Sequence, residues 1–158
     1  MVEYIFDTSA FRTLFKNYYE SRFPTLWDNF ASLIKAGKIE SVREVANEIN
    51  SYPEVDRLMV WAKSNSSIFS IPTLEEQRVV QQIFQVSHFN DLVSRKVILS
   101  GKPCADPFLI ARAKTANCYL ITQEEYKPNS AKIPNVCEHF QVNCTDLEGF
   151  MTLENWNF

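Results

Sequence analysis

Apolar and polar positions along this chain predict strands that alternate with helices. The first strand is predicted at Val2 to Phe6, where an apolar run stops at Asp7. From Ser9 to about Tyr19 the apolar residues return at three- and four-residue spacing, the pattern of a helix with one buried face. A strand that ends at an acid and leads into a helix is typical of the reactive edge of an α/β protein.

The later elements are predicted from the same two periodicities and from turn residues. Helices are predicted at Pro24 to Gly37, at 43–49, from Pro53, twice between 73 and 100 with a break near Ser87, at Asp106 to Ala116, at 136–140, and from Thr145 or Asp146. Strands are predicted at 39–42, 67–71, 118–121 and 141–144.

Strands and helices that alternate over the whole length indicate an α/β fold with a parallel sheet. Right-handed crossovers then place helices on both faces of the sheet, and ligands bind beyond the carboxyl ends of the strands. A chain of 158 residues is long enough for one domain that buries roughly 70% of its unfolded surface. No repeat, low-complexity run or flexible linker interrupts it, so we expect a single domain over 1–158.

Six acidic residues follow a predicted strand or open a predicted helix at this carboxyl edge. They are Asp7, Glu44, Glu48, Asp106, Glu124 and Glu125. Carboxylates crowded together repel one another and raise one another's pKa unless cations lie among them. Mg²⁺ and Mn²⁺ prefer carboxylate and water oxygens, and they can activate water and neutralise a phosphate during phosphodiester hydrolysis. A divalent cation is therefore the natural reason for a cluster of these acids.

Each acid also has a purely structural interpretation. Asp106 before Pro107 and Asp7 before the first helix are good helix caps, and Glu48 fits an exposed helix face. His88 and His139 have no Cys, His or carboxylate at a spacing typical of a zinc site or a catalytic triad. No glycine-rich phosphate-binding motif is present.

Charge and cysteine content narrow the class of protein. The net charge of −3 argues against a basic nucleic-acid coat, but it is compatible with a nuclease whose active site is acidic. The four cysteines form no CxxC pair, so we expect reduced thiols and a cytoplasmic protein. No charged leader and no apolar run of ~18 residues is present, so no membrane association is expected.

Four segments of the chain resemble the PIN domain family. They are Phe6-Asp7-Thr8-Ser9, the stretch from Glu44 to Ile49, the stretch from Ala105 to Ala113, and Leu120-Ile121-Thr122-Gln123-Glu124. The resemblance covers nearly the whole chain. Within the family, the chain is similar to VapC-type toxins and to DUF4411-like chains. The resemblance implies a three-layer α/β/α sandwich with a parallel sheet of about five strands in the order 3-2-1-4-5.

The resemblance also implies an activity, a cofactor and partners. It implies an endoribonuclease that depends on Mg²⁺ or Mn²⁺, acts on RNA as the toxin of a type II toxin–antitoxin pair, and is covered by a protein antitoxin. The resemblance further implies a homodimer through the early helices, and the stretch from Phe11 to Trp27 is aromatic enough to permit it.

Carried over position by position, the resemblance implies catalytic and metal-binding roles for Asp7, Glu48, Asp106 and Glu124. Ser9 and Thr122 are implied as supporting hydroxyls. The fourth position is commonly Asp in the family, and the pair Glu124-Glu125 leaves either glutamate as the ligand. Glu44 is a second candidate for the role given to Glu48.

Basic residues near the proposed ligands could hold RNA phosphates, and a solvated surface role is the alternative for each. These are Arg12, Arg43, Lys102 and Arg112.

Two other functions stay open. One is a catalytically weak PIN-like module that binds or processes RNA, suggested by Glu at the fourth position. The other is a different α/β phosphohydrolase or signalling domain with an acidic pocket, which requires a second acid beside the first strand that Asp7-Thr8-Ser9 does not provide.

Overall fold

Five parallel strands form one sheet at the centre of the molecule. The structure is a computed structural model that describes residues 1–92 and 104–158. The strand order is β3-β2-β1-β4-β5, which confirms the predicted order. The strands are β1 (Tyr4–Phe6), β2 (Ile39–Val42), β3 (Phe69–Ser70), β4 (Tyr119–Ile121) and β5 (Cys144–Thr145).

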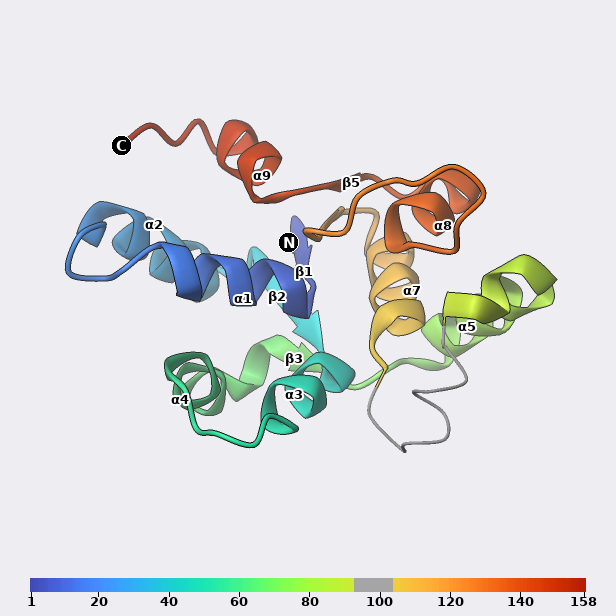
Figure 1. The fold of residues 1–158 in the computed structure, drawn as a ribbon, viewed down its shortest axis with the longest axis horizontal. Coiled ribbons are helices and arrows are strands. Elements are labelled where there is room, and N and C mark those ends of the chain that lie inside the picture. Colours follow the sequence, from blue (N-terminus) through green and yellow to red (C-terminus); the bar gives the residue numbers. More distant parts are fainter. Residues whose placement is uncertain (93–103) are drawn as a thin grey trace.

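Helices flank both faces of this sheet, as expected for right-handed crossovers. The helices are α1 (Thr8–Asn17), α2 (Pro24–Lys35), α3 (Arg43–Asn50), α4 (Arg57–Ser64), α5 (Leu74–Gln85), α7 (Asp106–Ala116), α8 (Ile133–Phe140) and α9 (Leu147–Leu153), with short 3₁₀ turns η1 (Ser66–Ile68) and η2 (Ser87–Leu92). In Figure 1, α1, α2 and α4 lie on one side of the strands, and α5 and α7 lie on the other. The predicted α/β architecture is therefore confirmed.

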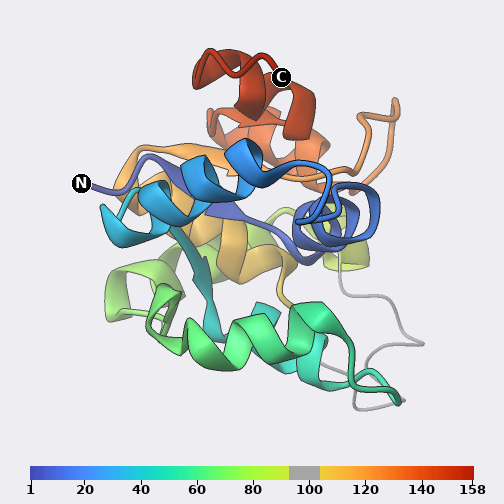
Figure 2. The same cartoon turned by 90° about the vertical axis from the view of Figure 1, so that its left-hand side faces the viewer.

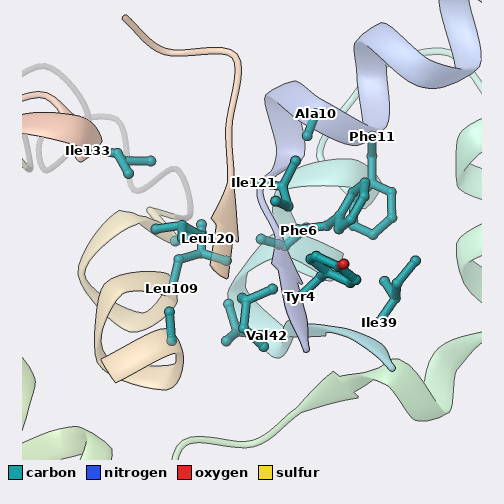
Figure 3. Close-up of a cluster of buried hydrophobic side chains, with 14 of the residues drawn as sticks. Tyr4, Phe6, Ala10, Phe11, Ile39, Val42, Leu109, Leu120, Ile121 and Ile133 are labelled. Carbon is teal, nitrogen blue, oxygen red and sulfur yellow. The ribbon is translucent and has the colours of Figure 1, made fainter. Parts of the chain in front are cut away.

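The central strand β1 is held by aromatic side chains from three helices. All three residues of β1 are buried. The ring of Phe6 lies 5.2 Å from Phe11 of α1, 5.9 Å from Phe30 of α2 and 5.1 Å from Phe150 of α9. Figure 3 shows Phe6 beside Phe11, with Leu109 of α7 at the opposite face. Burying one such side chain stabilises the fold by about 2 kcal/mol. The packing of Phe6 against three helices therefore fixes the position of the end of β1.

Several element boundaries differ from the prediction. The helix predicted to open at Pro53 begins at Arg57, because the Asp56 carboxylate caps it by accepting the N–H of Met59 at 2.8 Å. Val55, which would lie in the first turn of the predicted helix, is 77% exposed. The helical turn predicted at 136–140 begins earlier, at Ile133, and the strand predicted at 141–144 is shifted to Cys144–Thr145.

The end of α8 explains the shifted strand. Gln141 has a φ of +58° and ends this helix in the left-handed conformation, so the chain must turn before it can pair with β4. Other predicted ends are confirmed: α7 spans Asp106 to Ala116, and Gly37 follows α2 with a φ of +70°. The second helix predicted between 73 and 100 is a 3₁₀ turn as far as Leu92, and the rest of that prediction lies outside the described residues.

The carboxyl ends of β1 and β4 lie side by side. Phe6 pairs with Ile121, and the next residue, Asp7, donates its N–H to the carbonyl of Ile121 at 2.9 Å. The loop that follows β4 and the α3–α4 connection reach out on the same side of the molecule in Figure 2. These segments therefore surround the edge at which the acids were predicted.

Two further sequence predictions concern cysteines and membranes. Cys104, Cys118, Cys137 and Cys144 are all free thiols. In the two described ranges, every helix is too short or too polar to cross a lipid bilayer.

Candidate active site

Asp7 is a buried carboxylate held by two hydroxyl groups. Its side chain follows β1 and is only 4% exposed. Its Oδ2 accepts hydrogen bonds from the hydroxyls of Ser9 at 2.7 Å and Thr122 at 2.8 Å. Burial raises the pKa of Asp7, and these two hydrogen bonds partly oppose that rise. Asp7 occupies the N-cap position of α1, but its side chain makes no capping hydrogen bond, so capping alone does not account for it.

The same hydroxyls join the ends of β1 and β4. Ser9 Oγ lies 3.2 Å from Thr122 Oγ1, and it accepts the N–H of Gln123 at 2.9 Å. Thr122 Oγ1 also accepts the N–H of Glu124 at 3.2 Å. Because every hydroxyl contacts both a carboxylate and a backbone group, the orientation of Asp7 is set by both strand ends.

Glu48 lies on α3 and faces the same edge. Its carboxylate accepts the Thr8 hydroxyl at 2.5 Å and the N–H of Ala105 at 2.7 Å. Burial raises the pKa of Glu48, these hydrogen bonds oppose the rise, and the negative charges of Asp7 and Glu124 add to it. The exposed-face interpretation of Glu48 is therefore wrong, because the side chain connects α1 to the start of α7.

Asp106 is the first residue of α7. The N-cap position is Ala105, and no side chain caps this helix, so the capping interpretation of Asp106 is wrong. Burial raises the pKa of Asp106 well above its ordinary value, and the charges of Asp7, Glu124 and Glu48 raise it further, while the Lys132 ammonium lowers it. Three other carboxylates thus act on Asp106 from separate segments of the chain.

Glu124 and Glu125 have different surroundings. Glu124 is half-buried, and its Oε2 accepts the N–H of Ile133 at the start of α8, at 2.9 Å. Glu125 is exposed. Of the pair, Glu124 is therefore the residue that lies with the other acids.

Glu44 points elsewhere. It is buried at the start of α3 and pairs with Arg43 at 2.7 Å, and its second oxygen has no hydrogen-bond partner among the described residues. Of the two candidates on α3, Glu48 is the one that lies with the other acids.

Two clefts meet at these acids. One, of about 540 Å³, is lined by all four of Asp7, Glu48, Asp106 and Glu124. The other, of about 610 Å³, is lined by Glu48, Asp106 and Glu124 and by the loop between β4 and α8. Glu48, Asp106 and Glu124 therefore line both clefts, and Asp7 lines the first.

Arg12 is the basic candidate that lines a cleft. It shares the first cleft with Lys16, and its Nη1 donates to Asp56 Oδ2 at 2.6 Å. Lys102 lies outside the described residues.

Two other basic candidates are held away from the clefts by ion pairs. Arg112 contacts Glu40 at 2.6 Å and Glu76 at 3.4 Å. Arg43 contacts Glu44. Arg43 and Arg112 therefore do not lie with the four acids, because their guanidinium groups pair with Glu44 and Glu40.

Several cleft residues were not predicted. Lys127, Lys132 and His88 line the second cleft, and Tyr52 lines the first. The loop that carries both lysines is held by the buried Asn135, which donates to the Lys127 carbonyl at 2.7 Å. The sequence position of this loop, directly after the predicted strand at 118–121, could have indicated that its lysines lie near the acids. Loops that follow the strands of a parallel sheet lie at its carboxyl edge.

The geometry does not form a closed metal site by itself. Among the described residues, no three His, Cys, Asp or Glu side chains converge closely enough to surround an ion. Any ion held here would take part of its coordination from water.

Comparisons with known proteins identify the family. In fold, the chain is similar to PAE2754 from Pyrobaculum aerophilum, with 15% sequence identity, a TM-score of 0.47, and coverage of 96% of this chain and 95% of the other. No curated protein matches the sequence. The family model described as a domain of unknown function, DUF4411, matches residues 4–158. The chain therefore belongs to the DUF4411 family.

Proposed function

We propose that this protein is a metal-dependent endoribonuclease that hydrolyses RNA phosphodiester bonds. The observation that carries the proposal is the meeting of Asp7, Glu48, Asp106 and Glu124, which come from four separate segments, in one cleft. The parallel sheet with the order 3-2-1-4-5 agrees with the PIN-like architecture that the sequence resembles. We therefore propose that the chain is a nuclease of the PIN type.

The donor set fits Mg²⁺ or Mn²⁺. The four side chains offer only carboxylate oxygens, and Mg²⁺ commonly keeps several waters and takes one or two carboxylates. This agrees with an arrangement in which no three ligands close around an ion. Burial raises the pKa of Asp7, Glu48 and Asp106, and neighbouring carboxylates raise the pKa of Glu48 and Asp106 further, so a bound cation would favour the ionised form of each. When bound, such an ion activates water and stabilises the charge that develops on the phosphate.

The chain's own residues have distinct roles in this proposal. Asp7 is oriented by Ser9 and Thr122 and would be the most fixed ligand. The pKa of Asp106 is raised well above its ordinary value by burial and by three neighbouring carboxylates, so a bound cation would favour its ionised form. Glu48 and Glu124 each use an oxygen to accept a backbone N–H, which leaves them better suited to water-mediated contact.

Cations on both sides of the acids suit an RNA backbone that crosses them. Lys16 lines the first cleft, and Lys127 and Lys132 line the second. Such contacts position a nucleic acid without reading its sequence. They also explain how a chain with a net charge of −3 could bind a polyanion.

We further propose that the protein acts as the toxin of a toxin–antitoxin pair, in which a protein antitoxin covers the clefts. This role is supported by the family resemblance of the sequence. A homodimer remains a prediction. Phe11 and Trp27 are buried within the chain, so a dimer through the early helices would use other side chains.

The decisive experiment measures cleavage of RNA by the purified protein with Mg²⁺ or Mn²⁺ and with a chelator. We expect cleavage with either ion and none with the chelator. Asp7→Asn should abolish cleavage and leave the melting temperature equal or higher, because it removes a buried charge. Glu125→Gln is the matched control, and it should cleave like the original chain because Glu125 is exposed.

Two outcomes would contradict the proposal. If the chain binds RNA but no metal supports cleavage, it is the catalytically weak RNA-binding module. The hydrogen bond from Ile133 that occupies one oxygen of Glu124 would favour that alternative. If Asp7→Asn fails to fold, Asp7 has a structural role instead.

A further inference from the structure

Arg12, Tyr52 and Asp56 form a stacked arrangement at the rim of the first cleft. The guanidinium carbon of Arg12 lies 3.4 Å from the centroid of the Tyr52 ring. The same guanidinium donates to Asp56, whose other oxygen caps α4 by accepting the N–H of Met59. One face of the Tyr52 ring therefore rests on a cation that is itself fixed to the start of a helix.

The Arg12 guanidinium is committed to this contact. Its Nε and Nη2 atoms are buried and have no hydrogen-bond partner among the described residues. The N–H groups of a guanidinium normally donate to oxygen acceptors. In Arg12, the Nε and Nη2 groups are buried against other atoms instead. The orientation of Arg12 thus supports the ring rather than a second carboxylate.

The ring is nevertheless exposed. Tyr52 is 48% accessible to solvent, although it is a large aromatic residue, and it lines the same cleft as Asp7, Glu48 and Asp106. Because Arg12 covers one face, the accessible surface includes the other face and the edge. A flat ring of fixed orientation beside an acidic nuclease site is suited to stacking on a nucleobase.

We propose that Tyr52 is a stacking platform for an unpaired base of the RNA, next to the phosphate that lies over the acids. Arg12 and Asp56 are positioning residues for the ring. The substrate is then single-stranded at this point, because a base within a duplex is already stacked on its neighbours. Every base has an aromatic face, so the platform selects unpaired structure rather than base identity. This inference rests on the proposed function.

The binding test uses the Asp7→Asn protein and short unstructured RNAs that carry 2-aminopurine at one position each. We expect its fluorescence to fall on binding when the probe occupies the stacking position. Tyr52→Ala and Tyr52→Leu should lose this quenching and weaken binding by about 5- to 150-fold, the range expected for one base stacked on an aromatic ring. Tyr52→Phe should keep both, because it keeps the ring. The same RNA annealed to its complement should show no Tyr52-dependent quenching.

The cleavage test uses the same substitutions in the otherwise unchanged protein. Tyr52→Ala should raise KM for single-stranded RNA with little change in kcat. The matched control is Tyr19→Ala, which removes an exposed tyrosine away from the clefts and should change neither value. Melting temperatures of all variants identify any loss caused by misfolding, and rescue by Tyr52→Phe excludes it.

The outcomes separate this inference from the proposed function. If RNA is cleaved but quenching and KM are the same in Tyr52→Ala, the stacking platform is wrong and the nuclease stands. If RNA is not cleaved but quenching depends on Tyr52, the platform stands and the hydrolytic function is wrong. If Tyr52→Phe loses binding as fully as Tyr52→Ala, the hydroxyl and not the ring contacts the RNA, and stacking is overturned.

Discussion

The hydroxyl of Thr122 donates a hydrogen bond of 2.8 Å to Oδ2 of Asp7, which joins two residues that are 115 positions apart in the chain. Asp7 follows the central strand β1 and Thr122 follows its neighbour β4, so the bond exists because these strands are adjacent and parallel. It stabilises the ionised form of a carboxylate whose pKa is raised by burial.

Removing this hydroxyl should weaken both stability and activity. In Thr122→Val the shape is retained, but Asp7 loses a donor and the N–H of Glu124 loses its acceptor. We expect the free energy of unfolding in urea to fall by about 1–3 kcal/mol. The pKa of Asp7 should rise further, so the acid limb of the pH–rate profile should move to higher pH. Thr152→Val, at an exposed site on α9, should change the unfolding free energy by less than about 0.5 kcal/mol.

Asp106→Asn should stabilise the metal-free protein at neutral pH. A carboxyl whose folded-state pKa is raised binds more protons when folded than when unfolded, so its contribution to stability falls as the pH rises from about 4 through the raised pKa. Asparagine removes this loss, and we expect a gain in the free energy of unfolding at pH 7 that vanishes below about pH 4. Urea unfolding across this pH range measures it. Asp28→Asn, at an exposed position on α2, should show no such pH-dependent gain.

Mn²⁺ or Mg²⁺ should raise the melting temperature, because binding to the folded state alone is stabilising. At an ion concentration of about 100 times Kd the stabilisation is about 2.7 kcal/mol, equivalent to a shift of roughly 5–11 °C for a chain of this size. The shift should disappear in Asp7→Asn and Asp106→Asn and should persist in Glu125→Gln. An equal shift in all four proteins would show that the ions bind elsewhere.

The two glutamates of α3 should differ when each is replaced by glutamine. Glu48→Gln should lose metal-dependent cleavage, because Glu48 lies with the other acids and the charges of Asp7 and Glu124 act on it. Glu44→Gln should keep the cleavage rate of the folded fraction and change mainly the unfolding free energy, since Glu44 pairs with Arg43 outside the clefts. Loss of cleavage in a stably folded Glu44→Gln protein would reverse this assignment.

Lysines of the loop after β4 should contribute to RNA affinity without sequence preference. Lys132→Ala and Lys127→Ala should each weaken binding and lower the slope of log K against log salt by about one unit or less. Lys63→Ala, exposed on α4 and outside both clefts, should leave the slope unchanged. Filter binding of one RNA at several salt concentrations measures all three variants, and equal slopes would remove these lysines from the RNA path.

Local patterns were enough to predict most elements of this fold. The strand at Ile39–Val42 and the helix at Asp106–Ala116 were predicted at their observed bounds, because periodicity and helix-start residues act over a few neighbouring positions. The predicted start of α4 was wrong. Proline is common as a first helical residue, which favoured Pro53, but the helix begins at Arg57 because the Asp56 carboxylate caps it. When two nearby residues could each begin a helix, the hydrogen bonds that the folded chain makes determine which of them does.

The sequence by itself determined that acids follow the strands and therefore gather at one edge, because parallel strands end on the same side of a sheet. Only the tertiary structure decided which acids meet: it turns Glu48 and Glu124 toward Asp7 and Asp106, and it leaves Glu125 in solvent and pairs Glu44 with Arg43. It also paired Arg112 with Glu40 and placed Tyr52 over Arg12. The physical reason is that a side chain's partner is set by distances between segments far apart in the chain, which no local pattern of residues encodes.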